Sequence, residues 1–346
     1  MPIYTKEGWL DIPAILNQGC WLNVIIGTRQ IGKTFGVTKY LVENRIPHIY
    51  MRRTKDELDV ITDDPDLNPY LALRKVGLKA DLISVRSGWQ ITTETEVESE
   101  EGVITEEEKI GIGLPLGRIA KLRGFSGDSY NELVFDEFIP EKLVVQRKSE
   151  GDAFRNAIIT IEGNRVLEKK PPLRVWLLAN ANDLFSPIAI AMKLVPKIEE
   201  MTRRGQEVRV YEKEGILICL PSGEAVTKKR MNDPILSYLN DDSAFADMAF
   251  RNAFAYNDTG KVKPKEIRGW KPMLRTAKFY VWQRGRHLYV CRSAHKVGKL
   301  YTASDDDRIR CNLDYPEMTA LYRYDFITFS DAEILYEFRI YFSIKK

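Results

Sequence analysis

Residues 27–34 combine glycine, lysine and threonine in a spacing that suits phosphate chemistry. They match the pattern G-x-x-x-x-G-K-[ST] at every fixed position and read Gly27, Thr28, Arg29, Gln30, Ile31, Gly32, Lys33 and Thr34. Such a loop turns its backbone N–H groups toward an anion, and the helix that follows aims the positive end of its dipole there. We expect the whole loop to bind a nucleotide, with Lys33 at the β- and γ-phosphates and the Thr34 hydroxyl on Mg²⁺.

The acidic pair Asp136 and Glu137 follows an apolar run at residues 133–135. In a hydrolytic nucleotide site the first carboxylate binds Mg²⁺ and the second polarises the attacking water. The alternative is an exposed acidic turn after a core strand. Together with the glycine loop, the pair favours hydrolysis of ATP, which is preferred to GTP by default because we find no base-reading motif.

Hydrolysis also needs groups that contact the γ-phosphate and stabilise the charge of the transition state. Asn180 follows the apolar residues 175–178 and is a candidate for the first role, although a turn-forming asparagine gives the same pattern. Arg29, inside the loop, and Arg165, acting on a neighbouring subunit, are candidates for the cation, with Arg155 as a weaker option. Each of these arginines could equally lie on the surface without a catalytic role.

Apolar β-rich runs alternate with helical stretches over the first 200 residues, which is typical of a parallel α/β sheet. Polar residues follow these runs, as expected for buried strands whose carboxyl ends carry chemistry. Residues 92–109 alternate acidic and other side chains, which favours an exposed hairpin over a metal site. The expected strands cover residues 21–26, 49–51, 133–135 and 175–178, and the helix after the loop covers residues 34–44.

After residue 202 the pattern changes to a hairpin at residues 207–220, a helical stretch at 228–256 and a small β-rich unit with a helical end. We therefore predict an ATPase domain over residues 1–221, a helical linker region over 222–262 and a small C-terminal domain over 263–346. Residues 1–200 carry 26 Lys and Arg against 30 Asp and Glu, whereas residues 201–346 carry 26 against 19. The basic C-terminal part points weakly to a polyanionic partner.

The composition is that of an ordinary globular protein, with 44% hydrophobic and 29% charged residues among 346. No apolar run approaches the length that crosses a bilayer, and the N-terminus lacks the layout of a secretory signal. Four dispersed cysteines and three histidines make a structural zinc site improbable. We expect a cytosolic protein with reduced thiols and no membrane partner.

Several segments go beyond a general nucleotide-binding pattern. Arg29 and Gln30 ahead of the Gly-Lys-Thr give a loop variant that resembles the large terminase ATPases of tailed phages. Further segments are similar to the compact packaging ATPases of small podophages with protein-primed genomes, and the order holds through most of residues 20–200. They cover residues 49–58, 113–116, 133–138, 163–165, 178–181 and 194–196.

This resemblance implies a RecA-like ASCE ATPase domain with a mainly parallel sheet, joined by a linker to a small α+β domain related to RNase H-like nucleases. It implies a homo-oligomeric ring of five subunits that is docked on the viral portal in the host cytoplasm and pumps double-stranded DNA into the procapsid. A structural RNA is a further possible partner. In such rings an arginine completes the neighbouring subunit's site, and here that role falls on Arg165, although Gly163 stands where another arginine is expected.

Other functions remain open at this point. A helicase or segregation ATPase would share the same core, and a P-loop kinase or a non-catalytic nucleotide-gated assembly protein would share the loop. The acidic pair and the basic C-terminal part argue against a kinase. Contacts to DNA would be mostly to phosphates, from candidates at Arg52, Arg53, Lys55, Lys121, Arg123, Lys228, Lys229, Arg230 and residues 261–271.

We predict that the C-terminal domain has no nuclease activity. A two-metal nuclease needs carboxylates that converge from separate strands, whereas Asp305, Asp306 and Asp307 are expected in one short solvated loop. Purified protein incubated with Mg²⁺ and plasmid DNA should leave the plasmid supercoiled on an agarose gel. Nicking that depends on Mg²⁺ would contradict this prediction.

Overall fold

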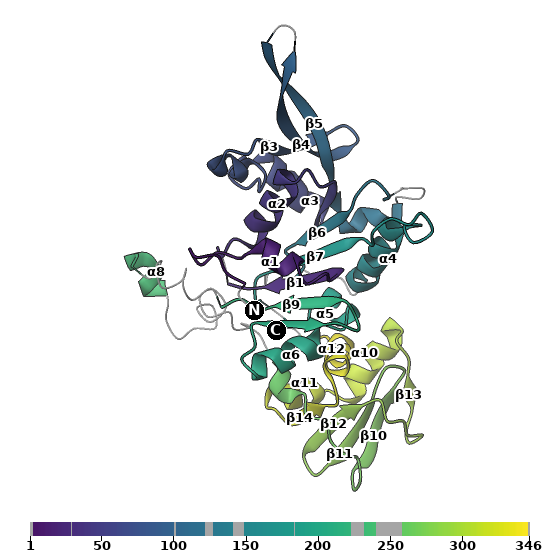
Figure 1. The fold of residues 1–346 in the computed structure, drawn as a ribbon. Helices are drawn as coiled ribbons and strands as arrows, with labels where there is room; N and C mark the ends of the chain where they lie inside the picture. Colours follow the sequence, from purple (N-terminus) through teal and green to yellow (C-terminus); the bar gives the residue numbers. More distant parts are fainter. Residues whose placement is uncertain are drawn as a thin grey trace. The chain divides into compact units, whose positions relative to one another are not determined.

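A computed structural model describes residues 3–28, 30–99, 102–121, 127–140, 149–182, 184–222, 232–239 and 258–344. The chain divides into two compact units, residues 1–256 and residues 257–346 (Figure 1). The division falls within the range expected for the linker, most of which lies outside the described residues. No helix that the structure describes is long and apolar enough to span a bilayer.

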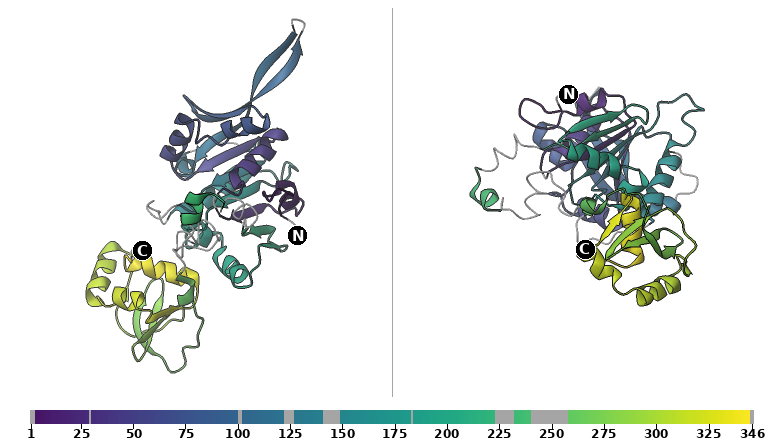
Figure 2. Two further views of the ribbon diagram at one scale, coloured as in Figure 1. Left: turned by 90° about the vertical axis from the view of Figure 1, so that its left-hand side faces the viewer. Right: turned by 90° about the horizontal axis from the view of Figure 1, so that it is seen from below.

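The first unit is built on a nine-stranded sheet. Six neighbouring strands, from β5 to β9, pair in parallel, and the strands at both edges pair antiparallel (Figure 2). The predicted mainly parallel sheet is therefore confirmed. The order across the sheet is β3 (Ala80–Val85), β4 (Gly88–Ser99), β5 (Gly102–Pro115), β2 (His48–Arg52), β6 (Glu132–Asp136), β7 (Arg174–Ala179), β1 (Leu22–Ile26), β9 (Ile216–Cys219) and β8 (Val208–Tyr211).

Helices cover both faces of this sheet. On one face, residues of α1 (Ile12–Leu16), α2 (Lys33–Glu43) and α3 (Lys55–Asp63) share a hydrophobic core with Val134 and Trp176 of the central strands. On the opposite face, Phe135 packs against Phe154 of α4. The period of two along β6 therefore alternates between the two helical layers. The remaining elements of this unit are η1 (Leu71–Val76), η2 (Leu116–Lys121), α4 (Glu150–Glu162), α5 (Pro187–Ala191), α6 (Val195–Arg203) and α8 (Pro234–Leu239).

The acidic segment forms the predicted hairpin. β4 and β5 pair antiparallel from Trp89 and Gly113 at the sheet to Ser99 and Gly102 near the tip, and the hairpin extends well beyond the sheet (Figure 1). The side chains of Glu106, Glu107 and Glu108 are exposed. The base of β5 also pairs in parallel with β2, so the hairpin is a continuation of the central sheet.

The second unit is a five-stranded mixed sheet with helices, as predicted for a small α+β domain. Its core is aromatic, with Phe279, Phe329 and Phe338 fully buried. The strand order is β13 (Leu300–Tyr301), β10 (Lys271–Thr276), β11 (Tyr280–Arg284), β12 (His287–Cys291) and β14 (Ile327–Phe329), and the helical elements are η3 (Asp258–Lys261), α10 (Asp305–Asp314), α11 (Met318–Arg323) and α12 (Ala332–Tyr341).

One expectation for this unit is wrong. Asp305, Asp306 and Asp307 form the first turn of α10 and not a loop. The Ser304 side chain caps the helix by accepting a hydrogen bond from the Asp307 N–H, and acidic residues are favourable in a first turn because they face the positive end of the helix dipole. Among the described residues no three His, Cys, Asp or Glu side chains are grouped as metal ligands.

We predict that Gly151→Ala destabilises the first unit. A Cβ at residue 151, in α4, would lie 2.6 Å from Ala191 Cβ and 2.6 Å from the Pro187 carbonyl oxygen. Such overpacking costs about 1–3 kcal/mol, against a gain in helix propensity of about 1 kcal/mol. The urea midpoint should therefore fall. Gly117→Ala is the control, because a Cβ there meets nothing within 4 Å, and equal midpoints for both variants would contradict the packing argument.

Candidate functional site

The loop between β1 and α2 has the strained backbone that phosphate cradles require. Gly32 has a φ of 83° and Gln30 a φ of 60°, both in the left-handed region that favours glycine. A Cβ at Gly27 would lie 2.6 Å from Ile31 Cδ1 and 2.8 Å from Pro221 Cγ. The close approach explains why residue 27 is glycine, and the left-handed backbone explains why residue 32 is glycine. Arg29 lies outside the described residues.

Lys33 is buried at the first position of α2 and turns its ammonium group toward the loop. Its Nζ donates hydrogen bonds to the Gly27 carbonyl (3.1 Å), the Thr28 carbonyl (2.7 Å) and Asn180 Oδ1 (3.0 Å). Asn180 follows β7, the strand next to β1. The structure thus brings together Lys33 and Asn180, two of the predicted site residues from different elements.

The acidic pair lies at the end of β6, on the same edge of the sheet. Asp136 is buried, and its Oδ1 accepts a hydrogen bond from the Thr34 hydroxyl at 2.9 Å. Glu137 follows with a φ of 55° and a side chain that is 45% exposed. One carboxylate therefore faces the loop, while the other stays accessible to solvent.

These groups line a cavity of about 350 Å³, within the range of small-ligand sites. Its lining comes from the loop, the start of α2 and the ends of β6 and β7, and comprises Gln30, Gly32, Lys33, Thr34, Phe35, Asp136, Glu137, Ala179 and Asn180. A hydroxyl and a carboxylate held 2.9 Å apart are the oxygen donors that Mg²⁺ prefers. The residues present fit a nucleotide with its magnesium ion.

Two residues that sequence reasoning had not placed in the site belong to it, Tyr50 and Arg52. They lie on β2, which pairs with β6, and both reach Asp136 Oδ2, from the Tyr50 hydroxyl at 2.7 Å and from Arg52 Nη1 at 3.3 Å. Arg52 Nη2 also donates to Glu137 Oε2 at 3.1 Å. Burial alone would lower the pKa of Arg52, but the acidic groups around it raise that pKa above its usual value, so the guanidinium stays charged.

Arg52 and Arg53 are therefore not placed to contact DNA, contrary to expectation. Arg52 is nearly buried among carboxylates, and Arg53 is fully buried with Nη2 donating to Glu150 Oε1 at 2.8 Å. Glu57 of α3 contacts both arginines, at 3.5 Å from Arg52 Nε and 3.6 Å from Arg53 Nη1. These contacts tie β2, α3 and α4 together around the acidic edge of the site.

The structure does not bring Arg165 to the loop between β1 and α2. Its side chain is fully buried, and the guanidinium donates to the carbonyl oxygens of Gly127, Tyr130 and Pro171 and to Asn131 Oδ1. To act on a neighbouring subunit, Arg165 would have to leave all these acceptors, which is costly for buried carbonyls. Arg155, by contrast, is exposed on α4.

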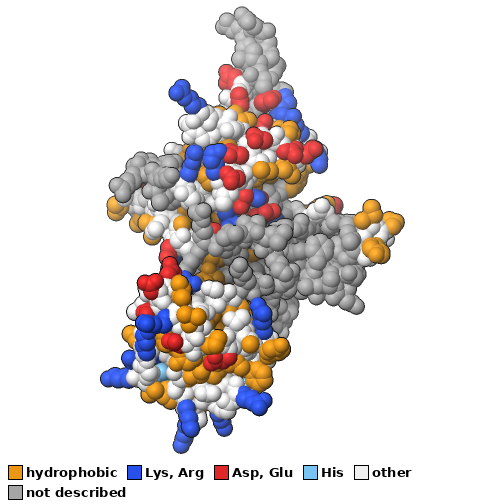
Figure 3. All heavy atoms as spheres, turned by 180° about the vertical axis from the view of Figure 1, so that it is seen from behind, with side chains coloured by type: hydrophobic (Ala, Val, Ile, Leu, Met, Phe, Trp, Pro, Cys, Tyr) orange, Lys and Arg blue, Asp and Glu red, His pale blue; other side chains and the backbone are white. Residues whose placement is uncertain are grey.

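The other basic candidates divide between the units. Arg123, Lys228, Lys229, Arg230 and the side chain of Lys121 lie outside the described residues. Residues 257–346 carry 18 Lys and Arg against 11 Asp and Glu, so the whole positive excess of the C-terminal part belongs to the second unit. Figure 3 shows Lys and Arg side chains spread around this unit. Lys263, Lys265, Arg268 and Lys271 are exposed there.

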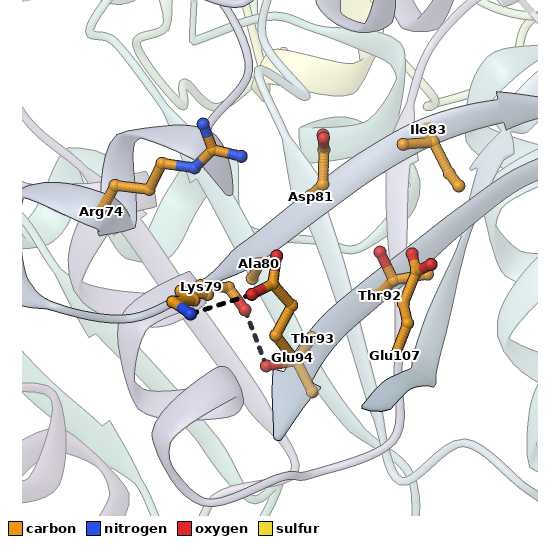
Figure 4. Close-up of a pocket in the computed structure, with 9 residues that line it drawn as sticks. All are labelled: Arg74, Lys79, Ala80, Asp81, Ile83, Thr92, Thr93, Glu94 and Glu107. Atoms are coloured by element: carbon orange, nitrogen blue, oxygen red, sulfur yellow. Dashed lines mark hydrogen bonds and ion pairs between the residues drawn. The ribbon is translucent and has the colours of Figure 1, made fainter. Parts of the chain in front are cut away.

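A second hollow lies at the base of the hairpin (Figure 4), on strands far across the sheet from the loop. Its polar groups are largely satisfied within the chain. Lys79 Nζ lies 3.1 Å from Glu94 Oε2, and the Thr93 hydroxyl donates to the Lys79 carbonyl at 2.9 Å. We assign no chemistry to this hollow.

Fold and site together define a mixed α/β protein with a strand–loop–helix cavity at the carboxyl edge of its sheet. No protein-family model matches the chain, and no curated protein matches it. The chain is similar in structure to the phi28 gp11 DNA packaging motor, with a TM-score of 0.62 and 17% identity over 99% of each chain. It is also similar to the bacteriophage phi29 viral genome packaging motor assembly, with a TM-score of 0.61 and 19% identity over 96% of this chain and 99% of that one. The resemblance to phage packaging ATPases is thus confirmed as a likeness of fold.

We predict that Arg165 stabilises the fold. Arg165→Met keeps most of the side-chain volume but removes the charged donor of four hydrogen bonds, which should lower the free energy of unfolding by about 3 kcal/mol. Arg155→Met should change it by less than about 0.5 kcal/mol, because that side chain is exposed. Urea denaturation of both variants measures the difference. Unchanged stability of Arg165→Met would return Arg165 to the candidates for a role in trans.

Proposed function

We propose that this chain is an ATP-hydrolysing motor that translocates double-stranded DNA into a viral procapsid as one subunit of a ring. One observation supports this most: Lys33, Thr34, Asp136, Glu137 and Asn180 converge on one cavity, in a chain whose whole length has the fold of phage packaging motors. The side chains in the cavity are those that a nucleotide hydrolase needs. The likeness of fold to packaging motors supports a role in moving DNA.

In this proposal the loop and the start of α2 bind the nucleotide phosphates. Thr34 and Asp136 would hold Mg²⁺, which neutralises phosphate charge when it is bound. The Lys33 ammonium, now shared between two carbonyl groups and Asn180, would donate to the β- and γ-phosphates instead. Asn180 would then be released next to the γ-phosphate, where its amide can orient the attacking water.

Glu137 is the residue that we propose to accept a proton from that water. Its side chain is the more exposed of the two acids and lines the cavity. Arg52 Nη2 donates a hydrogen bond to Glu137 Oε2 at 3.1 Å, which holds the carboxylate at the edge of the cavity. Arg29, inside the loop, remains our candidate for the cation that stabilises the transition state in cis. A trans role for Arg165 is compatible with the proposal only if Arg165 leaves its buried acceptors.

The second unit is our candidate for contact with DNA or the portal. Its positive excess would favour a phosphate backbone without reading the sequence, as a motor on any DNA requires. We retain residues 1–221 as the ATPase domain, 222–262 as the linker region and 263–346 as an inactive RNase H-like domain. We further propose a pentameric ring docked on the procapsid portal in the host cytoplasm, with a structural RNA as a possible additional partner.

We predict that double-stranded DNA of any sequence stimulates ATP hydrolysis and that Glu137→Gln abolishes it. Loss of a general base lowers turnover by about 10²–10⁴-fold, while the loop still binds nucleotide. The measurement is steady-state phosphate release with and without DNA, beside binding of a fluorescent ATP analogue. Glu106→Gln is the control, because Glu106 is exposed on the hairpin. Turnover that ignores DNA, or that needs a small phosphate acceptor, would contradict the packaging role.

A further inference from the structure

The Tyr50 and Arg52 side chains of β2 reach the acidic edge of the site. His48, Tyr50 and Arg52 are two residues apart, so they share one face of the sheet. The Tyr50 side chain belongs to the hydrophobic core on that face, and it is 1% exposed. Its hydroxyl donates to Asp136 Oδ2 at 2.7 Å. A buried tyrosine hydroxyl needs such a partner, and here the partner is the carboxylate that we assign to the metal.

The two oxygens of Asp136 have different tasks. Oδ1 faces Thr34, whereas Oδ2 faces away from the loop and accepts from Tyr50 and Arg52. The Tyr50 contact is the shorter of the two on Oδ2. Because a carboxylate that is held at one oxygen cannot rotate freely, the Tyr50 hydroxyl fixes the direction in which Oδ1 points.

Tyrosine suits this task because it donates a hydrogen bond without adding positive charge. A second cation at Oδ2 would weaken the attraction of the carboxylate for a metal ion, whereas a neutral O–H leaves the full negative charge available. A tyrosine hydroxyl has an ordinary pKa of about 10, so it keeps its proton at neutral pH and remains a donor to Asp136.

The neighbouring Tyr70 is buried in the same cluster but has a different partner. Its ring meets the Tyr50 ring edge-on, with centroids 5.7 Å apart, and its hydroxyl lies 2.7 Å from His48 Nε2. Burial lowers the pKa of His48 to about 4, so the ring is neutral at physiological pH. Its Nδ1 lies 2.7 Å from the Ile46 carbonyl, which can only accept, so Nδ1 carries the ring proton and Nε2 accepts a hydrogen bond from the Tyr70 hydroxyl. Tyr70 thus supports the packing of Tyr50, but its hydroxyl bonds to His48 and not to Asp136, which makes Tyr70 a matched control.

We propose that Tyr50 is a positioning residue that orients Asp136 and thereby sets the affinity of the nucleotide site for Mg²⁺. Tyr50 acts through the carboxylate and does not touch nucleotide or metal itself. The inference rests on the proposed function only in taking Thr34 and Asp136 as the metal-binding pair, and it needs neither DNA nor a ring.

The test compares Tyr50→Phe with Tyr70→Phe, each of which removes one buried hydroxyl oxygen. A fluorescent ADP analogue is titrated in EDTA and at a series of free Mg²⁺ concentrations. Loss of a group that orients a metal ligand typically lowers metal affinity about 10–100-fold. We expect Tyr50→Phe to raise the Mg²⁺ concentration for half-maximal enhancement of binding by this factor, with unchanged affinity in EDTA. Tyr70→Phe should keep the wild-type Mg²⁺ dependence even if its thermal stability falls.

Each outcome decides the proposal. A wild-type Mg²⁺ dependence in Tyr50→Phe, or an equal shift in both variants, would overturn it.

A second comparison applies if Tyr50→Phe does not fold. Asp136→Asn is then compared with the double variant Asp136→Asn/Tyr50→Phe, and the buried carboxylate is absent from both. If Tyr50 acts through Asp136, adding Tyr50→Phe changes the Mg²⁺ dependence no further; an additional shift overturns the proposal. Because the readout is binding, wild-type protein without ATPase activity would refute the motor and leave this test intact.

Discussion

The buried carboxylate of Asp136 is the constraint on which the site depends. It closes a strand with every residue buried, so its charge has to be compensated by donors inside the protein. Those donors come from two other elements, Thr34 on α2 and Tyr50 and Arg52 on β2. The sheet order brings these donors to Asp136. β2 lies directly beside β6, and α2 follows the loop after β1, which is two strands from β6. Charge compensation at one carboxylate thus links three segments distant in sequence.

The two neighbouring arginines at the end of β2 supply further charge compensation. Arg52, the last residue of β2, contacts the acidic pair, and Arg53, which follows it, binds Glu150 at the start of α4. Glu57 contacts both, so the strand end, α3 and α4 form one network of buried charges. Removing one partner from such a network is costly, because it leaves an uncompensated buried charge. Arg52 and Arg53, which resemble a basic surface patch in the sequence, therefore hold the acidic edge of the site together.

Short sequence patterns predicted those parts of the site that depend on residues close together in the chain. The glycine loop, the acidic pair and Asn180 each follow an apolar strand, and parallel strands bring their carboxyl ends to one edge. Tyr50 and Arg52 were not predicted as site residues, because their partner Asp136 is 86 and 84 residues away and comes close only through the sheet order. The only indication in the sequence was that they stand two residues apart on a strand. Nothing near Arg165 in the sequence indicates its burial, because its acceptors at residues 127, 130, 131 and 171 meet only in the folded chain. The helix at Asp305 was readable from Ser304 and Asp307, which have the spacing of a capping motif.

The distribution of charge between the units bears on how such a motor would hold DNA. Residues 1–256 carry 34 Lys and Arg against 38 Asp and Glu, and the described glutamates of the hairpin are exposed. A surface with net negative charge repels phosphates over roughly the Debye length, about 8–10 Å at physiological salt. Residues 257–346 carry a net positive charge, so in the proposed motor the small unit would attract the DNA backbone and the large unit would hydrolyse ATP. Force on DNA would then have to pass through the segment that joins them, which makes the coupling of hydrolysis to movement a property of the linker as much as of the site.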